Sequence, residues 1–172
     1  MSDATLINQV IAATTLSLRE FLPSSFSLAD ASEKADQAWE LQWRPHSQRK
    51  PPNGGWHWPS CRLARRDDPS RIFTAMWCRQ ETELCGLLLL RLNSTACRIA
   101  MVEGSPNPHH SIRGLVLLIA VELASMYAQK TGRREIWVSG PTSDMVLQHL
   151  LSDYGLELAA PKRAAVFYRR EV

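Results

Sequence analysis

Apolar residues follow a helical period at the beginning of the chain. They recur every three or four positions over residues 4–22, which predicts a helix that the following proline ends. Ser27 and Asp30 then form an S-x-x-D start signal, and small residues at helical spacing up to Trp39 predict a second helix. These patterns indicate a helical N-terminal part.

A loop and a change of period separate this part from the rest. Residues 44–60 hold four prolines, an Asn-Gly-Gly turn and the run Trp56-His57-Trp58, which predicts a long loop. A short helix is predicted at residues 59–66. Three apolar stretches joined by polar turns follow, as is typical of an antiparallel meander, and they cover residues 72–79, 84–92 and 97–103.

Helices and strands alternate in the last third of the chain. A strongly apolar, buried helix is predicted over residues 112–131, with Gly132 as its left-handed C-cap. A strand, a helix and two closing strands complete the order, at residues 135–139, 142–154, 156–159 and 165–169. One strand–helix–strand crossover joined to a meander predicts a single α/β domain. Its sheet is mixed, mostly antiparallel and flanked by helices.

Composition narrows the class of protein. The 172 residues suffice for one domain, and 45% hydrophobic with 22% charged residues excludes a disordered or fibrous chain. The longest apolar run, residues 115–121, is far shorter than the roughly 20 residues that span a bilayer, so no membrane association is expected. No signal peptide is evident, and a cytoplasmic location is expected. The scattered cysteines predict reduced thiols without a disulfide frame or metal site: Cys61, Cys78, Cys85 and Cys97.

The net charge of +3 is unevenly distributed along the chain. Residues 1–40 carry two basic and six acidic side chains, a balance of −4, whereas residues 41–80 carry eight basic and two acidic ones, a balance of +6. A basic segment of this kind attracts an anion, whether a nucleotide, a coenzyme or a nucleic acid. A cluster of arginines such as Arg62, Arg65, Arg66 and Arg71 is more typical of a solvated face, and no recognised nucleic-acid motif accompanies it.

From residue 71 onward, the order of elements resembles the GNAT superfamily of N-acetyltransferases. That family has a pyrophosphate loop of form Q/R-x-x-G-x-G/A before its long helix, and residues 108–116 stand at the matching place. The loop keeps Gly114, while Ser111 and Val116 depart from the pattern. The helical start of the chain implies that the first strand of the family is missing or displaced.

A second family motif, N-x-x-A-x-x-x-Y-x-x-x-G-F, aligns with the helix after the fifth strand. It matches at Asp144, Leu147, Leu151, Gly155 and Leu156. Leu151 stands where many family enzymes have the tyrosine that protonates the departing thiolate, which puts that step in doubt.

The resemblance implies acetyl-CoA as co-substrate, between the fourth and fifth strands and along Met101 and Val102. Its pyrophosphate would lie on Ile112, Arg113, Gly114, Leu115 and Val116. A helix N-terminus offers unpaired N–H groups and a positive dipole end, which suits a pyrophosphate. Alternatively, Gly114 is a tolerated glycine within a buried helix.

Two residues are candidates for proton transfer. Glu103 ends the fourth strand and is the only carboxylate between Glu83 and Glu122, so it is the candidate base. It is otherwise a solvated strand-end charge or an ion-pair partner of Arg98. Tyr154 lies one turn beyond Leu151 and is the candidate acid, or else a tyrosine at the edge of the core.

The tryptophan-rich loop is the candidate acceptor site. Trp56, His57 and Trp58 suit an aromatic wall over an amine substrate, or a tryptophan plug that covers the sheet edge. The adjacent His109 and His110 are not expected to bind a metal, because no cysteine or aspartate is near them in the sequence.

Three hypotheses for function follow. The first is an acyl-CoA-dependent N-acyltransferase, specifically an N-acetyltransferase, that acts on an unidentified amine. The second is a catalytically degenerate GNAT-like module that binds a protein or nucleic acid, and the third is a transferase that modifies a nucleic acid. The chain is expected to be a monomer or a homodimer, paired through an exposed C-terminal strand.

Overall fold

The computed structural model describes residues 3–47, 49, 55–66, 68, 70–139, 151–159 and 167–172. One seven-stranded sheet runs through the molecule in the order β1-β2-β3-β4-β5-β7-β6. β4 and β5 are parallel, and the other neighbours are antiparallel. The predicted mixed, mostly antiparallel sheet is therefore confirmed. The strands are β1 (Ser27–Asp30), β2 (Arg71–Cys78), β3 (Glu83–Leu92), β4 (Ala96–Gly104), β5 (Glu135–Ser139), β6 (Glu157–Ala159) and β7 (Phe167–Glu171).

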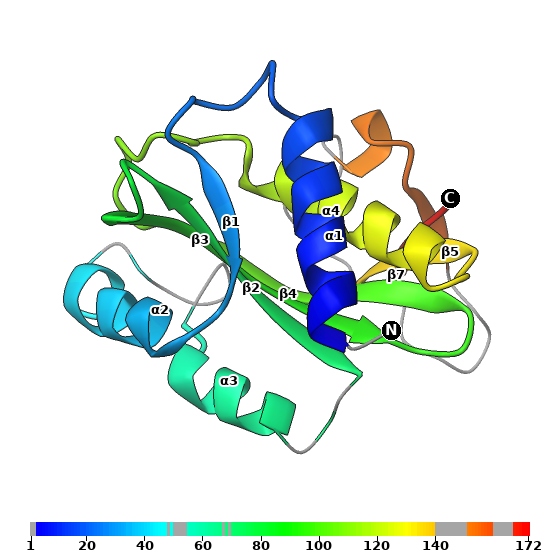
Figure 1. The fold of residues 1–172 in the computed structure, drawn as a ribbon, viewed down its shortest axis with the longest axis horizontal. Helices are drawn as coiled ribbons and strands as arrows, with labels where there is room; N and C mark the ends of the chain where they lie inside the picture. Colours follow the sequence, from blue (N-terminus) through cyan, green and yellow to red (C-terminus); the bar gives the residue numbers. More distant parts are fainter. Residues whose placement is uncertain are drawn as a thin grey trace.

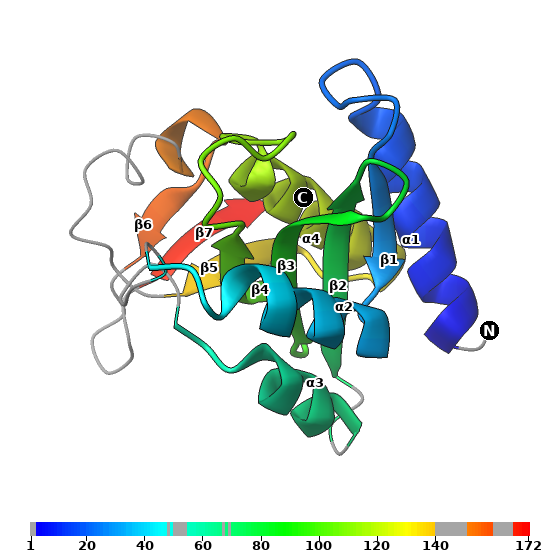
Figure 2. The same ribbon diagram turned by 90° about the vertical axis from the view of Figure 1, so that its left-hand side faces the viewer.

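Helices cover both faces of this sheet (Figures 1 and 2). α1 (Asp3–Ser17) and α4 (Val116–Lys130) pack against each other on one face. α2 (Glu33–Ala38), a π-helical turn η1 (Trp39–Trp43) and α3 (Trp58–Arg66) cover the other face. None of the helices in the described ranges is long and apolar enough to cross a membrane.

The segment at Ser27–Asp30 is the strand β1, so the prediction that a helix begins there is wrong. Leu28 is buried in the core, and the strand pairs with β2 from Ser27↔Trp77 to Asp30↔Thr74. A four-residue strand is specified by its partner, and this pairing overrides the local capping signal. The first strand is consequently present, next to β2, and α1 precedes it.

The two faces of the sheet bury different side chains. The face under α1 and α4 holds a core that is mostly aliphatic, here called the aliphatic core, which includes Val10, Leu88, Leu90, Ile99, Ile119 and Leu123. The face under α2, η1 and α3 holds five large rings, here called the aromatic core: Trp39, Trp43, Trp58, Phe73 and Trp77.

The long helix begins four residues later than the apolar pattern predicts. It starts at Val116, because Gly114 lies in the left-handed region with φ +82° and breaks the helical path. Its end is as predicted: Gly132 has φ +69°, and Arg133 N–H donates to Ala128 O at 2.8 Å, as in a Schellman motif. The middle of the helix is buried, while its first turn is only partly buried.

The helix predicted over residues 142–154 falls largely on residues 140–150, which lie outside the described ranges. Asp144 and Leu147 of the second motif are among them. Residues 151–153 are helical, and Gly155 follows with φ +72°. The short helix α3 and the strands β2 to β5 lie within two residues of their predicted bounds.

Candidate functional site

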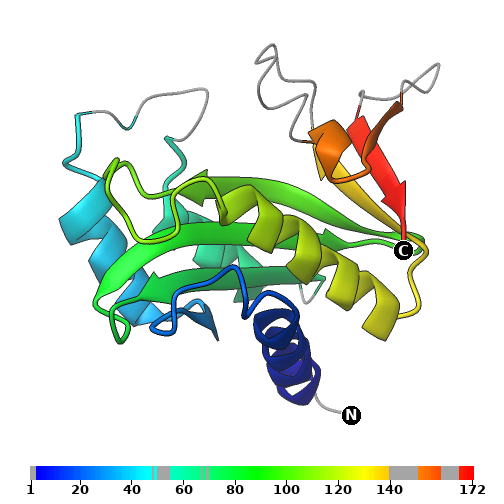
Figure 3. The ribbon, with the colours of Figure 1, turned by 90° about the horizontal axis from the view of Figure 1, so that it is seen from above.

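The strand β4 loses one of its two neighbours halfway along its length. It pairs with β3 as far as Gly104, but with β5 only over residues 96–99. Figure 3 shows β5 and β7 turning away from the plane of β2, β3 and β4. Among the described residues no strand covers the β5 side of β4 beyond Ile99. Unpaired backbone N–H and C=O groups seek partners, so this edge can bind an extended ligand. Met101 and Val102 lie on it.

A β-bulge shapes this stretch of β4. The register passes from Leu90↔Ile99 to Leu89↔Met101, so Ala100 is an extra residue. Ala100 and Met101 consequently both pack toward the aromatic core, whereas Val102 packs against the aliphatic core. Bulges bend a strand and re-aim its side chains.

The loop between β4 and α4 contains one residue anchored in the core, followed by two exposed residues. Ile112 is fully buried in the aliphatic core, while Arg113 and Gly114 are exposed. A Cβ at Gly114 would meet nothing within 4 Å, so the positive φ and not the available space requires glycine there. The alternative that Gly114 lies within the helix is therefore wrong.

Only part of the predicted set of N–H groups is free for an anion. The N–H groups of Arg113 and Leu115 donate to His110 O and Ile112 O. Within the described ranges, the N–H groups of Gly114 and of the first three residues of α4, Val116 to Leu118, have no backbone acceptor, whereas that of Ile119 donates to Leu115 O. This turn adjoins the end of β4, since a Cβ at Gly104 would lie 3.5 Å from Val116 Cγ2. The N-terminal end of α4 and the unpaired strand edge are thus neighbours.

Glu103 is a buried charge, only 4% exposed, and not a solvated one. Arg49 Nε lies 2.6 Å from its Oε1, and Arg49 Nη2 lies 3.2 Å from its Oε2. Trp58 Nε1 also donates to Oε2, at 2.5 Å. Its close ion-pair partner is therefore Arg49, which lies in the segment between η1 and α3, rather than the expected Arg98.

Arg49 joins this carboxylate to the tryptophan-rich loop. Its Nη2 also donates to the backbone oxygen of Trp56 at 2.5 Å, and its guanidinium carbon lies 4.8 Å from the centre of the Trp39 ring. Arg49 could not be selected from the sequence, because its partner Glu103 lies 54 residues further along the chain.

The three candidate acceptor residues have three different environments. Trp58 is fully buried and stacks on Phe73 at 5.3 Å between ring centres. The prediction that its ring faces a substrate is therefore wrong. Trp56 is partly exposed and meets Trp58 edge-on. His57 is exposed, packs edge-on against Trp39 and lies 2.8 Å, Nδ1 to Oγ, from Ser60. The tryptophans cover a face of the sheet, and not an edge.

No model of a protein family matches the chain, and no curated protein matches it in sequence. Solved structures do match. An acetyltransferase of the GNAT family from Staphylococcus aureus superposes with a TM-score of 0.60 at 13% identity, over 85% of this chain and 98% of that one. The ribosomal-protein alanine N-acetyltransferase from Escherichia coli gives 0.61 at 9% identity, over 86% and 94%. A variant of spermidine N-acetyltransferase from Vibrio cholerae gives 0.59 at 11% identity, over 87% and 94%.

The chain has the GNAT fold. The family resemblance noted in the sequence is thus confirmed at the level of the fold. The expectation that the first strand is missing or displaced is wrong, because β1 is present beside β2.

Tyr154 lies apart from the Glu103 cluster in the GNAT fold. It packs against the aliphatic core, and its backbone oxygen accepts a hydrogen bond from Arg170 Nη1 at 2.7 Å. Burial, and then the neighbouring Asp153 carboxylate, raises the pKa of Tyr154, so the hydroxyl keeps its proton at neutral pH. Leu151, at the position of the usual tyrosine, is a fully buried core residue.

Proposed function

We propose that this chain is an N-acetyltransferase that moves the acetyl group of acetyl-CoA to an amine. The observation that carries the proposal is the unpaired, bulged edge of β4 beside the N-terminus of α4. The structural neighbours that acetylate spermidine or a ribosomal-protein alanine support it at the level of the fold.

The residues present fit an anionic, extended coenzyme. The free N–H groups of Gly114 and the first turn of α4, with the exposed Arg113 guanidinium, suit the pyrophosphate. The β5 side of β4 at Met101 and Val102 offers backbone groups to the pantetheine arm. The coenzyme, when bound, supplies an activated acyl group as a thioester.

Proton transfer falls to Glu103 in this proposal. Three N–H donors occupy its two oxygens, so one lone-pair direction remains to accept a proton, directly or through water. The partly exposed Trp56 and the exposed His57 adjoin this cluster and form the candidate wall for the amine. Tyr154, which keeps its proton, is the candidate donor to the leaving thiolate.

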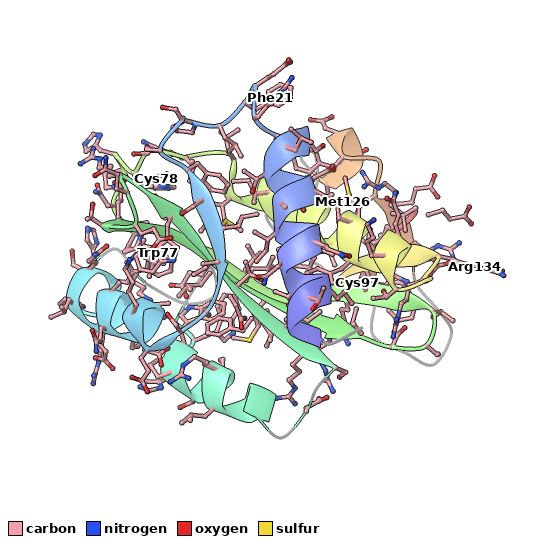
Figure 4. All side chains as sticks on the ribbon, viewed as in Figure 1. Phe21, Trp77, Cys78, Cys97, Met126 and Arg134 are labelled. Carbon is pink, nitrogen blue, oxygen red and sulfur yellow. The ribbon has the colours of Figure 1, made fainter. Side chains whose placement is uncertain are left out.

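Calorimetric titration of the reduced chain with acetyl-CoA, and with CoA for comparison, tests the proposal. We expect both to bind in the micromolar range, and Arg113→Glu to weaken both. Arg134→Glu is the matched control, because Arg134 is exposed and follows the C-terminal end of α4, whereas Arg113 precedes its N-terminal end (Arg134 is labelled in Figure 4). Absence of binding at millimolar ligand in the folded chain would overturn the proposal.

A module without catalysis is the second candidate, and the buried Leu151 favours it. Binding of acetyl-CoA without transfer to any amine in a broad screen would support this candidate. A nucleic-acid substrate receives less support, since two arginines of the basic segment are already paired. Arg62 Nε lies 2.6 Å from Asp36, and Arg71 Nε lies 3.0 Å from Asp68. Steeply salt-dependent RNA or DNA binding would reverse that judgement.

A further inference from the structure

Two cysteines and a glutamate meet at one end of the β2–β3 hairpin. The thiol sulfurs of Cys78 and Cys85 and a carboxylate oxygen of Glu83 all lie within 4.8 Å of one another. The hairpin register explains the meeting. Trp77 pairs with Leu84 and Met76 with Gly86, so Cys85 is an extra residue that turns to the same face as Cys78.

This group is enclosed by the protein. Both cysteines are fully buried, and the Glu83 side chain is only 14% exposed. Burial raises the pKa of both thiols, so without a cation they stay protonated. Ser111 Oγ donates to Glu83 Oε2 at 2.5 Å, which attaches the loop between β4 and α4 to the group.

A second, independent observation lies on that loop. His110 precedes Ser111, is 8% exposed, and its Nδ1 has no hydrogen-bond partner among the described residues. Burial lowers the pKa of His110, although the Glu83 carboxylate acts against this shift. An imidazole nitrogen that carries no proton can act as a lone-pair donor to a metal ion. A buried, unpaired nitrogen calls for a partner.

We propose that the group of Cys78, Glu83 and Cys85 holds a zinc ion and that His110, on the adjoining loop, supplies the fourth ligand. Two sulfurs, one carboxylate oxygen and one imidazole nitrogen make a four-coordinate donor set that Zn²⁺ accepts, whereas Ca²⁺ and Mg²⁺ prefer oxygen alone. Binding releases the two thiol protons to solvent, and the cation compensates the two thiolates formed. This inference reverses the expectation, drawn from the scattered cysteines, that no metal binds.

The site has a structural consequence that does not depend on the proposed transferase activity. Its ligands come from the β2–β3 hairpin and from the loop that leads into α4. A bound zinc ion therefore fixes this loop to the hairpin. The test uses metal content and spectra rather than acetyl transfer, so its failure leaves the acetyl-CoA titration unaffected.

The test uses the whole chain, purified under reducing conditions, stripped with a chelator and reloaded. We expect one zinc ion per chain by elemental analysis. Co²⁺ in its place is expected to give thiolate-to-cobalt charge-transfer absorption and the intense visible bands of tetrahedral cobalt. Cys78→Ser and Cys85→Ser should each abolish both signals.

Cys97→Ser is the matched control and should retain both signals. Cys97 is also a fully buried thiol, but it lies well away from Cys78, on β4 (Figure 4). Glu83→Gln and His110→Ala should each weaken zinc binding by about tenfold or more.

Two results would overturn the proposal. One is a folded wild-type chain that retains no zinc and gives no cobalt spectrum. The other is a mass lower by two hydrogens with Cys78 and Cys85 joined, which would make the pair a disulfide instead. Where a serine variant does not fold, the wild-type stoichiometry and cobalt spectrum still decide.

Discussion

The two faces of the sheet are stabilised by different kinds of contact, although both meet at β4. The aliphatic core relies on close packing of branched side chains under α1 and α4. The aromatic core stacks Trp58 on Phe73 and encloses the Arg49–Glu103 ion pair at its edge. Packing of branched side chains tolerates exchange of one apolar residue for another, whereas a buried charge tolerates only its own partner. The aromatic face should therefore be the more sensitive to single changes.

Breaking the buried ion pair should have the largest effect. Arg49→Met leaves the Glu103 carboxylate buried without its cation, which should destabilise the chain by about 3–5 kcal/mol. Urea unfolding followed by circular dichroism measures the loss. The control is Arg44→Met, because Arg44 pairs with Glu40 in solvent and such a pair contributes under about 1 kcal/mol. Equal losses in the two variants would refute the contrast between buried and exposed pairs.

A cavity in the aliphatic core should come next. Ile112→Ala removes a fully buried side chain below the loop and should lower the unfolding free energy by about 2–5 kcal/mol. It should also weaken acetyl-CoA binding, because Ile112 anchors the segment that carries Gly114. Leu158→Ala, at a 59% exposed position, should change the unfolding free energy by less than about 0.5 kcal/mol. Unchanged coenzyme affinity in Ile112→Ala would show that the loop binds the coenzyme independently of the packing of Ile112 in the aliphatic core.

Removing the charge of Glu103 should slow the reaction rather than weaken coenzyme binding. Glu103→Gln is expected to lower turnover about 100-fold or more if this carboxylate accepts the proton of the amine. Turnover and acetyl-CoA affinity are measured on the same preparation, at a temperature where the variant is folded. Unchanged turnover would remove Glu103 from the mechanism and leave it a purely structural ion pair.

The smallest effects are expected from alanine substitutions at the two glycines that flank α4. Gly114→Ala and Gly132→Ala each place a Cβ at a positive φ, and each should destabilise the chain by about 1 kcal/mol. Only Gly114→Ala should also weaken acetyl-CoA binding, because Gly132 lies at the far end of the helix. A similar loss of affinity in both variants would indicate a general effect on α4.

The strands β2 to β5 could be predicted from the sequence because apolar runs and turn residues specify them locally. β1 could not, because its pairing with β2 and the burial of Leu28 decide its conformation. The sequence predicts too early a start for α4, because the apolar pattern continues through Gly114 and contains no sign that this glycine has a left-handed φ.

The candidate site shows the same division. Glu103 could be selected because it is an isolated carboxylate at a strand end, but its partner Arg49 is distant in sequence and lies in a loop. The Cys78–Cys85 group could not be predicted from the sequence, because a hairpin bulge, and not a C-x-x-C spacing, brings the thiols together. Side-chain environment also reversed one assignment, since Trp58 is buried where a substrate-facing ring was expected.

The placement of β7 between β5 and β6 makes the last described strand the link that holds β6 in the sheet. In the described chain β6 is joined to the sheet through β7 alone, and β7 comes later in the sequence. β6 therefore belongs to the sheet only as the partner of β7, and removal of the residues from Phe167 onward would detach two strands instead of one. The same arrangement makes the three-residue β6 the outer strand beside residues 167–169 of β7, so over these residues the C-terminal strand is not the exposed edge that the sequence suggested.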